Sequence, residues 1–249
     1  MKYLKIIIPI SILSLIFIIN YYNKFYKPNT SFEAESIFLY VMKDDSIAFR
    51  DSISKYIKSE KTFYKVAEKL EYLENKKTGR FKIKRGIGNN DIVNSLKFNN
   101  TPVNVTFNNQ ERVEDLAGRL SNQIYEDSIS LLSAFTDQNF LEKNDLNEKN
   151  VLSIFIPNSY NIYWNTTSEN FRDRMLSEYN KFWNKDRLDK AEELGLTKLE
   201  VISLASIVQL ESRKVDERPR VAGLYVNRLR DNMRLQADPT VIYTIKEYY

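Results

Sequence analysis

A long apolar stretch opens the chain. Residues 6–23 carry no charged side chain and consist mainly of isoleucine and leucine. Lysines flank this stretch and aromatic residues gather at its end: Lys2, Lys5, Lys24, Lys27, Tyr21, Tyr22, Phe25 and Tyr26. About 18–20 such residues are enough for a thin bilayer, with aromatic side chains at the interface. The pattern predicts an uncleaved signal anchor in residues 1–27. A cleaved signal peptide is the alternative, although no small-x-small cleavage site follows.

Residues 28–100 mix strand and helix patterns. We expect a short linker at residues 28–31, followed by a strand within SFEAESIFLYV and amphipathic helices in DSIAFRDSISKYI and KTFYKVAEKLEYLENK. A second strand (residues 80–84) leads into a turn with Gly86 and Gly88 and a helix that opens near residue 89 or 90. The Gly-x-Gly lacks the third glycine and the lysine of phosphate loops, so a strand-turn-helix corner is favoured. This unit is a candidate glycan- or protein-binding module.

The middle of the chain is helical with one strand and an aromatic segment. A strand is predicted at residues 103–107, a helix from about Arg112, and further helices up to residue 150. Tyr160, Tyr163 and Trp164 follow in an aromatic-rich piece. Aromatic faces can stack on sugar rings, so these residues are candidates to line a sugar cleft. In a segment this rich in aromatic residues, the competing interpretation is that they belong to the hydrophobic core.

The segment from Thr197 onward carries the candidate chemistry. Thr197 and Glu200 form the start signal of a capping box. The helix that follows is apolar around most of its circumference, which predicts burial. Glu211 lies near its C-terminal end, where apolar neighbours and the helix dipole disfavour a negative charge. Such a carboxyl can hold a proton for a glycosidic oxygen; alternatively it points to solvent or pairs with Arg213 or Arg218.

A second amphipathic helix is expected at residues 217–229, with Pro219 in its first turn. The run MRLQADPTVIY then predicts a loop or hairpin that carries Gln236, Asp238 and Thr240. These polar residues are candidates for hydrogen bonds to sugar hydroxyl and acetamido groups, and equally for turn formation.

Composition narrows the chemistry. The chain contains neither cysteine nor histidine, which excludes thiol nucleophiles, thiolate or imidazole metal sites, and Ser-His-Asp triads. Acid-base catalysis would have to come from a carboxyl group, a lysine or a tyrosine. The net charge of +4 is spread over interspersed acidic and basic residues, so we expect no nucleic-acid partner.

Three ordered runs resemble one known family. ASIVQLES, ERPRVAGLYVNRL and MRLQADPTVIY, within residues 205–243, look like the hallmark of the endolytic murein transglycosylases, also called YceG-like proteins. Upstream, GRFKIKRG, NNTPVNVTFNNQERVEDLAGRLS and FIPNSYNIYWNTT resemble the Bacteroidetes branch of that family. The resemblance covers roughly residues 30–249.

The resemblance implies an α+β fold with three parts. These would be a cytoplasmic tail and transmembrane anchor (residues 1–27), a small LysM-like module (28–100) and a mainly helical transglycosylase domain (101–249). Family members continue past the DPTVIY run, so we expect that domain to be truncated here. The body would lie in the periplasm, anchored in the inner membrane, which the long polar region after a short tail also favours.

The resemblance also implies the reaction. Glu211 matches the essential Glu of the motif, and Gln209 stands where many members have a second Glu. Glu211 would cleave the MurNAc–GlcNAc bond of nascent peptidoglycan strands and form 1,6-anhydro-MurNAc ends, with no cofactor or metal. Gln236 and Asp238 are expected to bind substrate. Asp238 and Glu217 are candidates for a second carboxylate, but we expect structural or substrate-contact roles for both.

Two alternatives remain. One is a non-catalytic peptidoglycan-binding protein or scaffold for cell-wall synthases, which are possible partners beside the glycan and membrane lipid. The other is a lysozyme-type hydrolase, which would release reducing ends.

Overall fold

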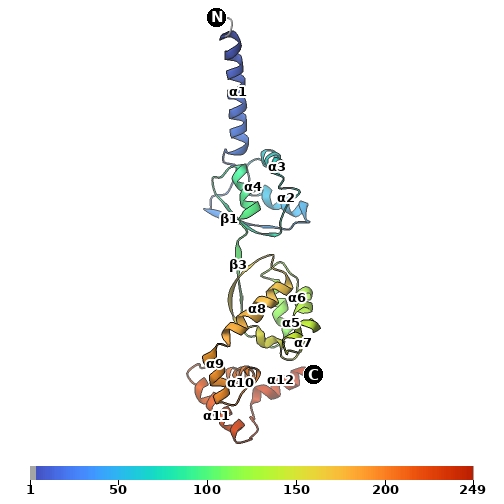
Figure 1. The fold of residues 1–249 in the computed structure, drawn as a ribbon, viewed down its shortest axis with the longest axis vertical. Helices are drawn as coiled ribbons and strands as arrows, with labels where there is room; N and C mark the ends of the chain where they lie inside the picture. The colour runs from blue at the N-terminus through green and yellow to red at the C-terminus, as the bar shows by residue number, and fades with distance from the viewer. Residues whose placement is uncertain (1–3, 249) are drawn as a thin grey trace. The chain divides into compact units, whose positions relative to one another are not determined.

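The computed structural model describes the backbone of residues 4–248 and the side chains of residues 7–245. Lys2, predicted to flank the anchor, lies outside the described residues. The fold is mixed and mostly helical, with two antiparallel strand pairs (Figure 1). The strands are β1 (Ser36–Val41), β2 (Gly79–Lys84), β3 (Pro102–Phe107) and β4 (Asn158–Tyr163). The helices are α1 (Leu4–Phe25), α2 (Ser46–Ser54), α3 (Glu60–Lys69), α4 (Asn89–Phe98), α5 (Val113–Ser121), α6 (Ser128–Phe135), α7 (Gln138–Lys143), the 3-10 helix η1 (Val151–Ile154), α8 (Ser168–Phe182), α9 (Lys185–Glu193), α10 (Lys198–Glu211), α11 (Arg218–Arg230) and α12 (Asp238–Tyr248).

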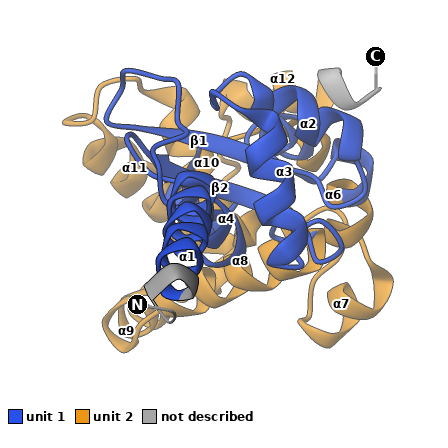
Figure 2. Ribbon diagram, turned by 90° about the horizontal axis from the view of Figure 1, so that it is seen from above, with its two compact units in different colours: residues 1–108, 116–130, 158–167 blue, residues 109–115, 131–157, 168–249 orange. Residues whose placement is uncertain are grey.

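The chain forms two compact units, coloured separately in Figure 2. Unit 1 holds the residues up to 108 together with 116–130 and 158–167. Unit 2 holds 109–115, 131–157 and the residues from 168 onward. The chain returns to unit 1 at residue 158 because β4 pairs with β3 in antiparallel register. The three-part division expected from the sequence stays a prediction.

A β-α-α-β arrangement forms the centre of unit 1. Strands β1 and β2 pair in antiparallel register, with Leu39 opposite Phe81. Alternate residues of both strands are buried, which is the period-2 pattern of a sheet with one covered face. Helices α2, α3 and α4 supply further core residues, including Phe49, Phe63 and Leu96. The strands and helices predicted for residues 31–96 are confirmed as β1, α2, α3, β2 and α4.

Helix α1 ends inside this core. Phe25, its last residue, is 4% exposed and packs with the buried residues of the module. Its ring stacks on Tyr21 at 4.4 Å between centroids, and the Lys69 ammonium lies 5.2 Å from the Phe25 ring centre. The final turn of α1 is therefore part of the folded module.

The segment after α1 is not a linker, so that prediction is wrong. Asn29 and Thr30 are each 5% exposed, and Pro28 forms a β-bridge to Gly88. The Asn29 amide donates to Asn89 Oδ1 (2.6 Å), and the Asn89 amide donates to the Lys24 carbonyl (2.8 Å). Buried amides form such bonds because an unpaired polar group in a core is costly. These bonds hold residues 28–30 against the start of α4.

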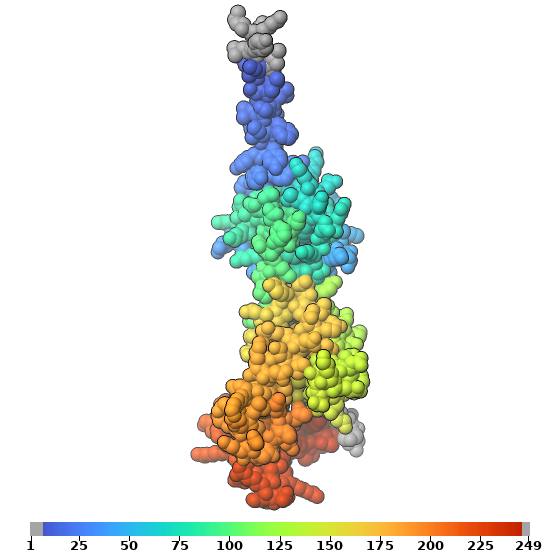
Figure 3. Space-filling model, viewed as in Figure 1, coloured from blue at the N-terminus to red at the C-terminus, as the bar shows by residue number. Residues whose placement is uncertain are grey.

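The rest of α1 is uncovered by the described parts of unit 1. Apolar side chains from Ile7 to Ile19 are about half exposed or more, and Figure 3 shows this segment (dark blue) standing clear of the module. Residues 7–25 are long and apolar enough to cross a membrane, with a mean hydropathy of 1.4, and no other helix in the described part of the chain meets that test. Length and composition fit a membrane anchor and a signal sequence alike.

Unit 2 contains two apolar clusters. In the first, Phe135 of α6 contacts Phe155 after η1 and Phe171 of α8. The second joins α10, α11 and the start of α12 through Leu204, Val208, Tyr225 and Ala237. This second cluster positions the candidate catalytic residue.

The predicted loop or hairpin over residues 233–243 is wrong from Asp238 onward, where α12 begins. Asp238 at the first position and Pro239 at the second are typical of a helix start. An acidic side chain complements the helix dipole there, and proline lacks only an amide that would be unpaired anyway.

Candidate active site

Helix α10 starts with the predicted capping box. The Glu200 amide donates to Thr197 Oγ1 (3.3 Å), and the Thr197 amide donates to Glu200 Oε2 (2.7 Å). This reciprocal pair satisfies two amides that the first helical turn leaves unpaired. The helix then runs for 14 residues and ends at Glu211. The cap therefore fixes where the candidate acid lies along α10.

Burial of α10 differs from the sequence-based expectation. Only Leu204 and Val208 are buried in this helix, while Leu210 is 61% exposed and Glu211 is exposed. The prediction of a fully buried helix is therefore wrong within the described residues. The physical reason is that α11 and α12 pack on the face that carries Leu204 and Val208. An exposed Glu211 is open to a polymer, which a buried one would not be.

A hydrogen-bonded corner follows Glu211 directly. Ser212, 7% exposed, caps α10 and donates from Oγ to Glu217 Oε2 (3.0 Å). Arg218 Nε donates to the Ser212 carbonyl (3.3 Å), and Lys214 Nζ pairs with Glu217 Oε1 (3.1 Å). These contacts connect the end of α10 to the start of α11. The sequence left open an ion pair between Glu211 and Arg218. In the structure, Arg218 instead donates to the Ser212 carbonyl.

Tyr225 of α11 is a buried polar residue in the cluster that packs against α10. It is 3% exposed and packs with Leu204 and Val208. Burial raises the pKa of Tyr225, and the side chain of Glu211 raises it further. The positive charge of Arg228 lowers this pKa, and the negative charge of Asp238 raises it. The charges of Glu211 and Asp238 thus act on the pKa of the same phenol. Tyr225 was not among the residues singled out from the sequence. Its place on the apolar face of the helix predicted at residues 217–229 could have indicated that it is buried.

Gln236 and Asp238 lie on either side of a buried alanine. Gln236 is exposed and has a φ of 52°, in the left-handed region. Ala237 is 1% exposed, and the Arg228 guanidinium donates to the Leu235 carbonyl, which fixes the turn. Asp238 is exposed at the first position of α12. Both predicted side chains are therefore presented by a turn that is itself packed in place.

Gln209 has a partner close to Glu211. Its Oε1 accepts from the Asn109 amide at 2.5 Å. The bond fastens the segment before α5 to the last turn of α10. Gln209 is thus engaged in a structural contact at the position where the family resemblance places a second Glu.

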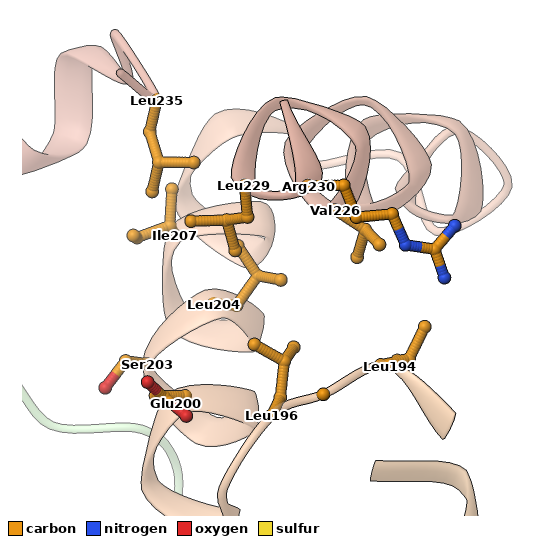
Figure 4. A pocket seen from close by; sticks show the side chains of 11 residues that line it. Leu194, Leu196, Glu200, Ser203, Leu204, Ile207, Val226, Leu229, Arg230 and Leu235 are labelled. Atoms are coloured by element: carbon orange, nitrogen blue, oxygen red, sulfur yellow. The ribbon is translucent and has the colours of Figure 1, made fainter. Parts of the chain in front are cut away.

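Cavities adjoin α10 in several places. One, of about 430 Å³, is lined mainly by apolar residues from the α9–α10 connection, α10 and α11 (Figure 4). It contains none of the three predicted site residues, and its apolar walls offer few partners for a sugar. A smaller pocket of about 150 Å³ lies between Leu210 and α12, with Glu111 and Tyr243 in its lining. It adjoins the turn that carries Glu211.

The aromatic residues proposed for sugar stacking divide into core and surface. Tyr160 is 8% exposed and stacks on Phe107, so the core interpretation holds for it. Tyr163 is 52% exposed. Trp164 contacts Tyr40 and Tyr125 edge to face, at 5.0 and 5.1 Å between ring centroids. All three belong to unit 1, whereas Glu211 belongs to unit 2.

The candidate site thus consists of a glutamate at the end of a capped helix and an Asp-Pro helix start, in a mixed, mostly helical protein. A profile of the YceG-like family matches residues 45–249. The chain therefore belongs to the YceG-like family.

Relatives and a solved structure agree with this assignment. The chain is 32% identical over 87 residues to the endolytic murein transglycosylases of two Streptococcus pneumoniae strains, D39 and R6. The match covers 35% of this chain and spans only 16% of those relatives. The fold is similar to the crystal structure of a YceG-like protein from Listeria monocytogenes, with a TM-score of 0.54 and 19% identity over 85% of this chain and 76% of that one.

Proposed function

We propose that this protein is an endolytic peptidoglycan lytic transglycosylase in which Glu211 is the catalytic residue. The observation that supports it most directly is the exposed carboxyl of Glu211, held at the end of α10 by a capped helix and a hydrogen-bonded corner. Membership in the YceG-like family and the named activity of the Streptococcus pneumoniae relatives supply the reaction class.

In the proposed reaction one carboxyl group acts twice. Protonated Glu211 gives its proton to the glycosidic oxygen as the bond from C1 of N-acetylmuramic acid to O4 of N-acetylglucosamine breaks. The resulting carboxylate then takes the proton of the muramyl 6-hydroxyl, and O6 bonds to C1. The product is a 1,6-anhydro ring, Glu211 regains its proton, and no water is consumed. This differs from glycosidases that use two carboxyl groups.

Gln236 and Asp238 are proposed substrate contacts. Both are exposed, and both flank the buried Ala237 in the turn that packs against Tyr225. An amide and a carboxylate suit the hydroxyl and acetamido groups of a glycan. Because the turn is held by the bond from Arg228 to Leu235, the backbone that carries these side chains needs little ordering on binding.

The β-α-α-β centre of unit 1 is proposed to be a LysM-like module beside an inner-membrane anchor. The burial of Phe25 in the module core supports retention of α1, because removal of a leader through residue 25 would take a core side chain away. The body is proposed to lie in the periplasm, and cell-wall synthases are proposed as possible partners.

The decisive experiment is digestion of purified glycan strands by the full chain in detergent, run in ¹⁸O-labelled water. Mass spectrometry is expected to show anhydro-muramyl ends without ¹⁸O at C1. Glu211→Gln keeps the size of the side chain but cannot donate the proton, and we expect a loss of about 10³-fold in rate.

Asp216→Asn is the matched control, since Asp216 is an exposed carboxylate in the connection that follows α10. It is expected to leave the rate unchanged. Labelled reducing ends would instead identify a hydrolase. Binding to the strands without any cleavage would support the non-catalytic scaffold.

A further inference from the structure

A polar cavity of about 540 Å³ lies in unit 1, between β2 and α4. Its volume is within the range of roughly 300–1,000 Å³ that is typical of ligand sites. None of the residues assigned to the candidate active site lines it. Two elements supply the charged and aromatic side chains of its lining: Lys82 and Lys84 from β2, and Asp91 and Phe98 from α4.

The β2 wall of this cavity is basic. Lys82 and Lys84 are alternate, exposed residues of the strand, so both side chains leave the sheet on its outward face. Arg80, the third basic residue on that face, is already engaged. Its guanidinium lies 3.6 Å from the ring centre of Phe38 and donates to the Pro102 carbonyl at 2.5 Å. Neither lysine forms a side-chain hydrogen bond or ion pair with any residue from 7 to 245, so two positive charges face the cavity without a partner.

The α4 wall presents one stripe of the helix. Asp91, Ser95 and Phe98 follow at spacings of four and three residues, which places them on the same side of α4. Ile92 and Leu96 lie on the opposite side and are buried in the module core. Phe98 is 73% exposed, and Asp91 is exposed as well. This wall therefore offers an apolar ring, a hydroxyl group and one carboxylate.

Backbone bonds hold the two walls together. After α4 the chain forms a β-bridge from Asn100 to Phe81. The Thr101 amide donates to the Arg80 carbonyl at 2.7 Å, and the Arg80 amide donates to Asn100 Oδ1 at 3.1 Å. The cavity is thus preformed, which lowers the cost of ordering the protein around a ligand.

The charges of the two walls select a class of ligand. Two ammonium groups on β2 match two carboxylates, and the carboxylate on α4 matches a positively charged amine. The ring of Phe98 and the hydroxyl of Ser95 suit a small aliphatic side chain and an amide group. A neutral sugar would leave both lysines without a counter-charge. The stem peptides of peptidoglycan, which combine alanine, glutamate and a diamino acid, carry the required groups together.

We propose that this cavity binds the stem peptide of an uncrosslinked peptidoglycan strand. Lys82 and Lys84 bind its carboxylates, Asp91 binds the free amino group of its diamino acid, and Phe98 contacts its aliphatic part. The inference rests on the proposed function, because peptidoglycan as the substrate is part of that proposal. The protein would then distinguish strands that carry peptides from denuded strands, through a unit other than the one that holds Glu211.

The test measures peptide binding to the full chain in detergent by fluorescence anisotropy. The probe is the tripeptide L-alanyl-γ-D-glutamyl-diaminopimelic acid, labelled at its N-terminus. Lys82→Gln combined with Lys84→Gln should raise its Kd about 10-fold, since each exposed ion pair contributes modestly. Lys58→Gln combined with Lys61→Gln is the matched control, because these exposed lysines of unit 1 lie outside the cavity. It removes the same charge and should leave the Kd unchanged.

Two altered probes test the pairing of charges. The same tripeptide with amidated carboxyl groups should bind the wild type about 10-fold more weakly, a result that requires no variant to fold. Asp91→Asn should weaken binding of the unmodified tripeptide about 3-fold. It should have no effect on a tripeptide that is acetylated at its side-chain amino group, because the partner of Asp91 is then already lost.

The outcomes separate this inference from the proposed function. If anhydro ends form but the amidated and unmodified peptides bind equally, or both double variants lose the same affinity, the stem-peptide site is refuted and the function stands. An equal loss of affinity for chitotetraose, a neutral sugar oligomer, in the Lys82 and Lys84 variant would also refute it. If the tripeptide binds as expected but the wild type forms no anhydro ends, the peptide site stands and the proposed function fails.

Discussion

Removal of the Phe25 side chain is expected to destabilise the module of unit 1. Phe25 is 4% exposed although it belongs to the apolar N-terminal helix. A buried phenylalanine covers about 200 Å² of surface, and each Å² contributes about 25 cal/mol. Alanine retains part of that area, and the stacking on Tyr21 at 4.4 Å is lost. Phe25→Ala should therefore cost about 3 kcal/mol, at the lower end for such core truncations.

Hydrogen exchange measured by mass spectrometry on the full chain in detergent reads this loss locally. Amides of β1 and α4 exchange through opening of the module, so 3 kcal/mol of lost stability corresponds to roughly 100-fold faster exchange. Phe17→Ala is the matched control, because Phe17 lies on the same helix and is 71% exposed. It should leave these amides unchanged. Equal exchange in the Phe25 and Phe17 variants would refute the conclusion that the last turn of α1 belongs to the module core.

Two further predictions concern the backbone and pH. A Cβ at Gly88 would lie 2.6 Å from the Tyr26 carbonyl, so Gly88→Ala should lower the free energy of unfolding in urea by about 1–3 kcal/mol. At Gly223, on α11, no atom lies within 4 Å of the Cβ site, so Gly223→Ala should raise it by about 0.5–1 kcal/mol. The backbone hydrogen bond from Thr197 lowers the pKa of Glu200, so its stabilising effect is present above the ordinary carboxyl pKa and is lost as pH falls through the lowered value. Between about pH 5 and pH 3 the Tm of Glu200→Gln should therefore fall less than that of the wild type; an equal fall would contradict a role for this carboxylate.

Much of the local structure follows from sequence patterns. The alternation in residues 36–41 and the Thr197–Glu200 pair specify β1 and the start of α10 through short-range physics, and both are found. The start of α12 was missed because Asp-Pro occurs in turns and at helix starts alike, and only packing of Ala237 distinguishes the two.

Tertiary contacts account for what the sequence could not provide. The burial of α10 was overestimated because its apolar residues surround the helix, while the neighbours cover one face. Residues 28–31 resembled a linker by composition, yet the amides of Asn29 and Asn89 meet across 60 residues of chain. Glu211 could be located from its motif, but Tyr225 depended on how α11 packs against α10.

The direct passage of α1 into a packed core has a geometric consequence for an anchored protein. A flexible tether would let the module turn freely above the bilayer. Here the helix axis and the β1–β2 sheet are joined through Phe25 and the Asn29–Asn89 bond, so they keep a fixed angle. In the proposed anchored form, any tilt that the helix adopts in the lipid is transmitted to the sheet, and bilayer thickness becomes a determinant of how the module is oriented.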